Sequence, residues 1–154
     1  SKDVESEDEV EITPTTNLKS NERETIMVVE DDETMCDCIS GLLVYHNYEV
    51  FSTNLAEDAL EFFEDSNSKI ELLLTDLILP KMRGSELAER LLKKNPEMKV
   101  IFMTGYSEEV FSQFNLPKGA TVLKKPFSLK GALSAVQKIL AKDAISERAH
   151  SKKR

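Results

Sequence analysis

The amino-acid sequence predicts an α/β fold: a doubly wound (βα)5 domain in three layers, with five parallel strands in one sheet and helices on both faces. Five short apolar runs alternate with longer amphipathic segments between residues 25 and 141. The runs begin about two dozen residues apart, which is the length of a strand–helix–strand unit with a right-handed crossover. The first, third and fourth runs are apolar without alternation, as is typical of parallel strands buried on both faces.

Each apolar run has the length of one strand, about five residues. In chain order the runs span residues 26–29, 48–51, 72–74, 100–103 and 120–123. No internal repeat extends beyond the strand–helix unit, so a single domain accounts for all of them.

The segments between the runs predict helices, because their apolar residues recur at intervals of three and four. The clear patterns cover residues 35–45, 55–63, 87–92 and 129–140, and a weaker pattern lies within 107–116. In the first helix Ile39, Leu42 and Leu43 share the apolar face. We expect Cys38 to be partly buried and Cys36 to be more exposed, since a spacing of two turns them to different faces.

Charge divides the chain into three parts. Residues 1–24 carry eight acidic and three basic side chains and predict an acidic, flexible linker. Residues 142–154 carry five basic and two acidic side chains and predict a basic C-terminal tail. Nearly all the large apolar residues lie between these ends, in residues 25–141, which we expect to form the folded domain.

Composition argues against several classes of function. The formal net charge of −8 disfavours direct binding of nucleic acid, because an acidic surface repels phosphate backbones. No apolar run approaches the ~20 residues that span a bilayer, so no membrane segment is expected in this chain. Two closely spaced cysteines make no disulfide framework and favour a reducing, cytoplasmic location.

Polar residues that can carry chemistry follow the predicted strands. Glu30 and Asp31 come after the first strand, Asp76 after the third, Thr104 after the fourth and Lys125 after the fifth. In open α/β sheets such residues gather beyond the carboxyl ends of the strands. The sequence therefore predicts that three carboxylates, a hydroxyl and an ammonium group share one rim.

Clustered carboxylates raise one another's pKa unless a cation joins them. Oxygen ligands without His or Cys suit a hard ion, Mg²⁺ or Mn²⁺. Beside such an ion one carboxylate can attack a phosphoryl group and hold it as an acyl phosphate. A lysine and a hydroxyl can then stabilise the phosphoryl oxygens. This set of residues predicts phosphorylation of an aspartate.

Four separated segments resemble the receiver domain of response regulators, the phosphoacceptor domain of two-component phosphorelays. They are residues 28–32 (Val-Val-Glu-Asp-Asp), 76–84 (Asp-Leu-Ile-Leu-Pro-Lys-Met-Arg-Gly), 102–107 (Phe-Met-Thr-Gly-Tyr-Ser) and 123–127 (Leu-Lys-Lys-Pro-Phe). They follow the order and spacing of that family across residues 25–141. The resemblance implies the flavodoxin-like strand order 2-1-3-4-5 and a domain that takes its phosphoryl group from phosphohistidine.

The resemblance also implies a role for each residue at the rim. Asp76 is the phosphoacceptor. The metal ligands are Asp31, which binds directly, Asp76, Glu30 and the backbone carbonyl of Ile78. Thr104 and Lys125 bind the phosphoryl group.

Three further features follow from comparison with the family pattern. The peptide bond between Lys125 and Pro126 is expected to be cis, as is usual in the family. Glu30 stands where Asp is more frequent, and its extra methylene should still allow outer-sphere contact with the metal. The switch region comprises Thr104 and Val122, and the family often has Tyr or Phe at the position of Val122, so the usual aromatic switch is in question.

Other chemistry fits the sequence less well. A phosphatase with an Asp nucleophile, of the haloacid dehalogenase type, wants a second acid two residues later to protonate the leaving group, and that position holds Ile78. A flavodoxin-like cofactor module would need a hydroxyl- and glycine-rich loop where this chain has acids at residues 30–33. No dinucleotide or Walker loop is present in the sequence.

Two contexts stay open for the domain. Residues 84–89 and 102–106 are similar to receivers at the carboxyl end of hybrid sensor histidine kinases, which favours a C-terminal receiver from such a kinase. The alternative is a stand-alone single-domain response regulator. In either context we expect a histidine kinase or a histidine phosphotransfer domain as partner, slow autodephosphorylation, and a monomer or weak dimer. A parent kinase would itself be a transferase, and a membrane anchor elsewhere in it would leave this domain cytoplasmic.

Overall fold

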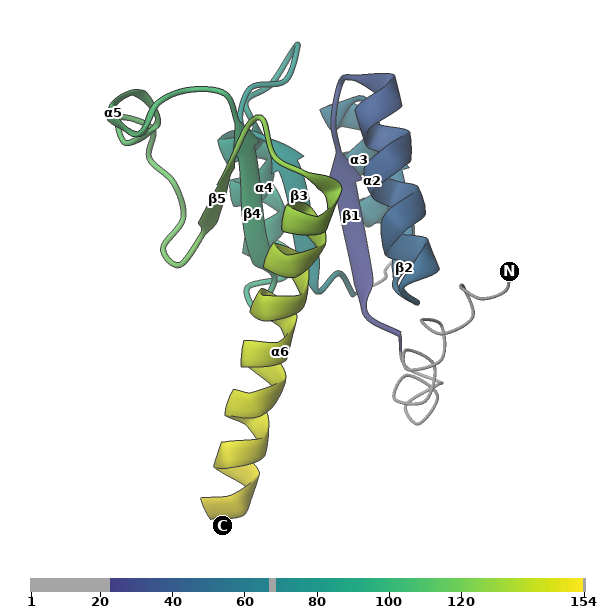
Figure 1. Ribbon diagram of the computed structural model, residues 1–154, viewed down its shortest axis with the longest axis vertical. Helices are drawn as coiled ribbons and strands as arrows, with labels where there is room; N and C mark the ends of the chain where they lie inside the picture. Colours follow the sequence, from purple (N-terminus) through teal and green to yellow (C-terminus); the bar gives the residue numbers. More distant parts are fainter. Residues whose placement is uncertain (1–22, 67–68, 154) are drawn as a thin grey trace, which may run out of the picture.

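The computed structural model describes residues 23–66 and 69–153 and confirms the predicted sheet (Figure 1). The five strands are β1 (Thr25–Val29), β2 (Glu49–Thr53), β3 (Leu72–Asp76), β4 (Lys99–Thr104) and β5 (Thr121–Lys124). All neighbouring strands pair in parallel, in the order β2-β1-β3-β4-β5. The order reverses beside β1, so the carboxyl ends of β1 and β3 meet at the point where ligands bind in such sheets.

Helices cover both faces of this sheet. Their bounds are α2 (Glu33–Tyr45), α3 (Ala56–Ser66), α4 (Gly84–Lys94), α5 (Glu108–Phe111) and α6 (Leu129–Lys153). Helices α2 and α6 lie side by side on one face, and α3 and α4 lie together on the other. The domain therefore has the three layers that the sequence predicted.

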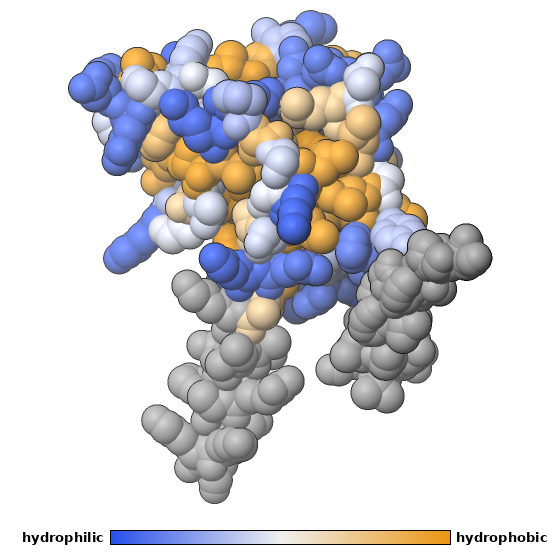
Figure 2. Space-filling view, in the orientation of Figure 1, coloured by the Kyte–Doolittle hydropathy of each residue, from blue (hydrophilic) through white to orange (hydrophobic). Residues whose placement is uncertain are grey.

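The core consists of two apolar clusters separated by the sheet. Met27 and Val29 of β1 pack toward α3 and α4, whereas Ile26 and Val28 pack toward α2 and α6. These four side chains are fully buried, because alternate residues of a strand point to opposite faces and both faces are covered. Figure 2 shows apolar surface near the centre of the face on which α2 and α6 pack. The edge of the cluster beneath that face includes half-buried Leu123 and Leu133.

The first helix shows that the sequence-based expectation for the two cysteines was wrong. Cys36 is buried, with 2% of its surface exposed, and Cys38 is exposed. Cys36 lies three residues before Ile39 and seven before Leu43, so it belongs to the buried stripe of α2. Its Sγ donates to the carbonyl oxygen of Thr53 at 3.7 Å, and burial raises the pKa of its thiol.

Two helices differ in length from their sequence patterns. The weak pattern within 107–116 gives only the four-residue α5, which turns follow. Phe111, the last residue of α5, and Phe114, in the turns, pack against the α3–α4 cluster. Helix α6 continues to Lys153 and so runs through most of the segment predicted as a tail. The predicted linker, apart from Arg23 and Glu24, lies outside the described residues.

Among the described residues, no helix is both long enough and apolar enough to cross a membrane.

Helix α4 begins in direct contact with the end of β3. The N–H group of Gly84 donates to the carbonyl oxygen of Leu77 at 2.7 Å. A Cβ atom built on Gly84 would collide with the backbone carbonyl oxygen of Asp76, and it would lie 3.2 Å from Oγ1 of Thr75. Only glycine therefore allows α4 to start this close to Asp76.

We expect Gly84→Ala to lower the free energy of unfolding by about 1–3 kcal/mol, as overpacking does, because its Cβ meets rigid backbone. The matched control is Gly41→Ala on the exposed side of α2, where a Cβ meets nothing within 4 Å. That control should raise the free energy of unfolding by roughly 0.5–1 kcal/mol, because alanine is the better helix former. Urea denaturation measures both. A Gly84→Ala protein as stable as the parent would contradict the close approach.

Candidate functional site

The structure brings together all five polar residues that the sequence placed after the strands. Glu30 and Asp31 follow β1, Asp76 ends β3, Thr104 ends β4, and Lys125 follows β5. Backbone hydrogen bonds keep the strand ends aligned: Leu77 donates to Met103 at 2.9 Å, and Lys125 donates to Thr104 at 2.7 Å. Four of the five residues, all but Glu30, line an open cleft of about 400 Å³.

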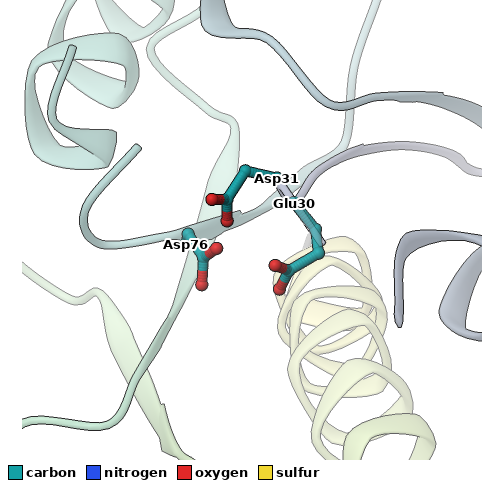
Figure 3. A group of neighbouring side chains, drawn as sticks. All are labelled: Glu30, Asp31 and Asp76. Carbon is teal, nitrogen blue, oxygen red and sulfur yellow. The ribbon is translucent and has the colours of Figure 1, made fainter. Parts of the chain in front are cut away.

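Three carboxylates face a common space at this rim (Figure 3). Each of Glu30, Asp31 and Asp76 offers an oxygen, and these oxygens all lie within 4.8 Å of one another. Glu30 is fully buried, Asp76 is 5% exposed and Asp31 is open to solvent. Two buried carboxylates and one at the opening concentrate negative charge where a ligand can enter.

Lys125 is the cation of the cluster. Its Nζ lies 2.9 Å from Oδ1 of Asp76 and 3.3 Å from Oε1 of Glu30. Burial lowers the pKa of the ammonium group, but the hydrogen bond and charge of Asp76, with those of Glu30, raise it above the ordinary lysine value. Lys125 is therefore held charged against the carboxylates. The Lys125–Pro126 peptide bond that follows is cis.

In Asp76, unlike in Lys125, burial outweighs the opposing effect of the neighbouring charge and favours the neutral form of the side chain. Loss of solvation raises the pKa of its carboxyl to about 8; the contact with Lys125 opposes this rise and the neighbouring Glu30 adds to it. The ionised form of Asp76 is thus costly without further positive charge. A carboxylate held in this way is poised to accept a cation or to react.

Glu30 is fixed by its surroundings. Its Oε2 accepts from the N–H group of Asp32 at 3.0 Å, and its backbone carbonyl oxygen accepts from Nδ2 of Asn54 at 2.8 Å. Asp32 in turn caps α2, accepting from the N–H group of Met35 at 2.9 Å. The capping role therefore falls to Asp32 and leaves Asp31 free to face the cleft.

The donor set fits a hard divalent cation. The ligand atoms are carboxylate oxygens, which suit Mg²⁺ or Mn²⁺, and no His or Cys joins the three-carboxylate cluster found among the described residues. Oε1 of Glu30 is buried and has no hydrogen-bond donor among those residues, apart from its ion pair with Lys125. A bound cation would neutralise the negative charge of the carboxylates that Lys125 alone does not compensate.

Thr104 and Ile78 also line the cleft, whereas Val122 lies outside it. Thr104 is 5% exposed, and its Oγ1 accepts from the N–H group of Tyr106 at 3.0 Å. Ile78 lines the cleft and is 40% exposed; the proposal that its carbonyl binds metal stays a prediction. Val122 is half-buried in β5, beside Phe102.

Sequence reasoning missed two supporting residues, Asn54 and Thr75, and the packing role of Gly84, which it had noted only as part of the 76–84 motif. Asn54 holds the backbone of Glu30, Gly84 admits α4 beside Asp76, and Oγ1 of buried Thr75 donates to the carbonyl oxygen of Asp76 at 3.0 Å. Asn54 follows β2 directly, so the rule that polar residues at strand ends form the site could have found it. The other two act through contacts that only the folded chain reveals.

Comparison with known proteins agrees with this geometry. The family described as "Response regulator receiver domain" matches residues 26–137. A chain from Methanospirillum hungatei JF-1, described as a CheY-like response regulator receiver domain protein, superposes with a TM-score of 0.72. The two sequences are 31% identical, and the match covers 81% of this chain and 99% of that one.

Two curated relatives come from Brucella abortus (strain 2308). The sensor kinase CckA is 33% identical over 120 residues, which are 77% of this chain but only 13% of CckA. The response regulator receiver protein CpdR is 32% identical over 116 residues, which are 75% of this chain and 95% of CpdR. The match to the family covers most of the chain, and the fold agrees with it. The chain belongs to the response regulator receiver domain family.

Proposed function

We propose that Asp76 accepts a phosphoryl group from phosphohistidine on a histidine kinase or a histidine phosphotransfer domain, with Mg²⁺ bound beside it. The observation that carries the proposal is the contact of 2.9 Å between Nζ of Lys125 and Oδ1 of Asp76, in a cleft that two further carboxylates border. If the ion pair between Lys125 and Asp76 served only to support the fold, the carboxylate would not need an open cleft beside it.

The proposed reaction is a simple displacement. One carboxylate oxygen of Asp76 attacks the phosphorus atom, the phosphorus–nitrogen bond of phosphohistidine breaks, and the imidazole leaves with the bonding electron pair. The product is a mixed anhydride on Asp76, which water later hydrolyses. Ile78 lines the cleft at the position where a phosphatase would need a proton donor, so the structure favours phosphoryl acceptance over phosphatase activity.

Each residue of the site has a role in this reaction. Lys125 binds an oxygen of the transferring group through its ammonium, and Thr104 can donate its hydroxyl proton to another. Asp31, Glu30 and Asp76 would hold Mg²⁺, which when bound neutralises the charge that gathers on the phosphoryl oxygens. The rigid strand ends keep these groups in position.

We also propose a context. Residues 25–141 form the receiver, with the acidic segment 1–24 as a linker and 142–154 as a basic end, and the domain acts in the cytoplasm as part of a hybrid sensor histidine kinase. The similarity to the sensor kinase CckA supports this. The match to 95% of CpdR supports a stand-alone regulator as the alternative. An upstream reading frame that encodes a kinase core would decide between the two.

Treatment with acetyl phosphate and Mg²⁺ should add one phosphoryl group to the protein, measured by intact mass. We expect no addition in Asp76→Asn or with excess EDTA, because the nucleophile or the charge compensation is then lost. The matched control is Asp32→Asn, which keeps a good helix cap outside the cleft and should label like the parent. Undiminished labelling of Asp76→Asn would refute the assignment.

Mg²⁺ should stabilise the fold, and more strongly as pH rises through about 8, where Asp76 ionises in the metal-free protein. Protons compete with the cation for that carboxylate, so acid weakens the site. With free Mg²⁺ at ten times its dissociation constant, the free energy of unfolding should rise by about 1.4 kcal/mol. Thermal denaturation measures this gain in stability. Asp31→Asn should reduce the gain, whereas Asp37→Asn should not, because Asp37 is exposed on α2. A gain independent of pH would contradict the role of Asp76.

A further inference from the structure

Helix α6 extends beyond the domain on which it packs. The last residue of α6 in the described core is Leu140, which lies in one cluster with Ile26 of β1. Residues 142–153 add about 18 Å of helix past that point, at 1.5 Å per residue. Figure 1 shows this end of α6 beyond the edge of the sheet at which β1 begins.

The part of α6 that packs on the sheet defines which side of the helix faces solvent. Val136 and Leu140 are buried, whereas Ser134 and Lys138 are exposed. Each residue of an α-helix turns by about 100°, so positions 142, 148 and 152 fall on the same side as 134 and 138. Positions 143 and 147, which hold Asp and Glu, instead continue the line of 136 and 140.

Positive charge collects on the solvent side of α6. We define the basic stripe as four residues on this side: Lys138, Lys142, Arg148 and Lys152. No acidic residue stands three or four positions from any of them in the sequence. Lys138 instead has Lys142 four positions later, and Arg148 has Lys152, a spacing at which like charges repel in a helix. The basic stripe therefore has no counter-charge within its own helix.

The sequence holds a matching acidic run near its other end. Residues 3–11, Asp-Val-Glu-Ser-Glu-Asp-Glu-Val-Glu, have six acidic and no basic side chains. They lie outside the described residues, which begin at Arg23, just before β1. Because α6 runs back along the sheet, its C-terminal end lies at the edge where β1 begins. Residues 12–24 can span about 40 Å when extended, so the acidic run can reach the basic stripe.

We infer that the acidic run, residues 3–11, binds the basic stripe of α6 in the same molecule. Single ion pairs at a protein surface are weak, but six negative charges face four positive ones here. The short connection also holds the two segments at an effective concentration on the order of mM. Segment 1–24 is then more than a linker, because it covers the basic end of α6.

Other anionic partners fit the basic stripe less well. An anionic lipid surface or a nucleic acid would have to displace the acidic run, which the chain itself keeps at high local concentration. Either partner would also meet a chain with a net charge of −8. The same chain is therefore the favoured source of the counter-charge.

A spin label on the acidic run tests this contact in the full chain. Ser6→Cys with Cys38→Ser leaves one accessible thiol, because Cys36 is buried. At low salt the label should broaden the amide resonances of residues 148–152 and remove roughly half of their intensity or more, given the high effective concentration. The intensity should return at about 1 M salt, where the Debye length is only about 3 Å.

Charge reversal identifies the surface that the label approaches. Lys142→Glu together with Lys152→Glu should abolish the broadening. The matched control is Lys93→Glu together with Lys94→Glu, at the exposed basic end of α4, which should leave the broadening unchanged. Resonances of α6 that stay sharp at low salt, or broadening that survives the reversal on α6, would overturn the inference.

Two mixtures distinguish the occupants. A ¹⁵N-labelled chain without spin label, mixed with a spin-labelled chain, should show no broadening in α6. Broadening in that mixture would assign the basic stripe to a second copy and overturn the inference. Phosphatidylserine vesicles should likewise leave the broadening of the spin-labelled chain intact. Its loss on binding to the vesicles would assign the stripe to a lipid surface and overturn the inference too.

Hydrogen exchange tests the contact without a spin label. Neutralising the centre of the acidic run by Glu7→Gln, Asp8→Asn and Glu9→Gln should speed the amide exchange of residues 148–152 severalfold. The reason is that the like charges of the basic stripe then repel without compensation and weaken the helix. Exchange rates that do not change would overturn the inference.

Discussion

The contact between Lys125 and Asp76 is the interaction on which the site depends. A carboxylate that is 5% exposed and shares its space with two others is costly to ionise, and a single ammonium group at 2.9 Å offsets part of that cost. The cluster keeps an excess of negative charge even so. In the proposed function, that residual charge would attract a divalent cation, and the cation would make a reaction with an anionic phosphoryl group feasible.

The fold supplies this arrangement by bringing strand ends together. Residues as distant in sequence as Glu30, Asp76 and Lys125 meet because β1, β3 and β5 belong to one parallel sheet, whose carboxyl ends share an edge. Helices on both faces bury almost every residue of the central strands β1, β3 and β4, so the ends of these strands are rigid platforms for their polar residues. The close start of α4 at Gly84 adds a further constraint on the backbone of Asp76.

The sequence was sufficient to predict the sheet and the grouping of the polar residues at the strand ends, because both follow from local features. Fully apolar runs indicate buried parallel strands, and the residues just after them must lie at the rim. The burial of Cys36 depends on the rotation of α2 against the sheet, which a spacing of two residues does not reveal. Phe111 at the end of the short α5 and Phe114 in the turns after it pack against the core, which the local pattern does not reveal. Gly84 matters because its Cα lies against the carbonyl group of Asp76, eight residues earlier in the chain. Such tertiary contacts override local patterns, so they appear only in the folded structure.

A crystal structure of the protein soaked with beryllium fluoride and Mg²⁺ tests the central claim most directly. We predict density for the fluoride on a carboxylate oxygen of Asp76, with the metal ion on Asp31 and Nζ of Lys125 against a fluorine atom. A cleft without added density at saturating reagent, or Lys125 turned outward to solvent, would contradict the account.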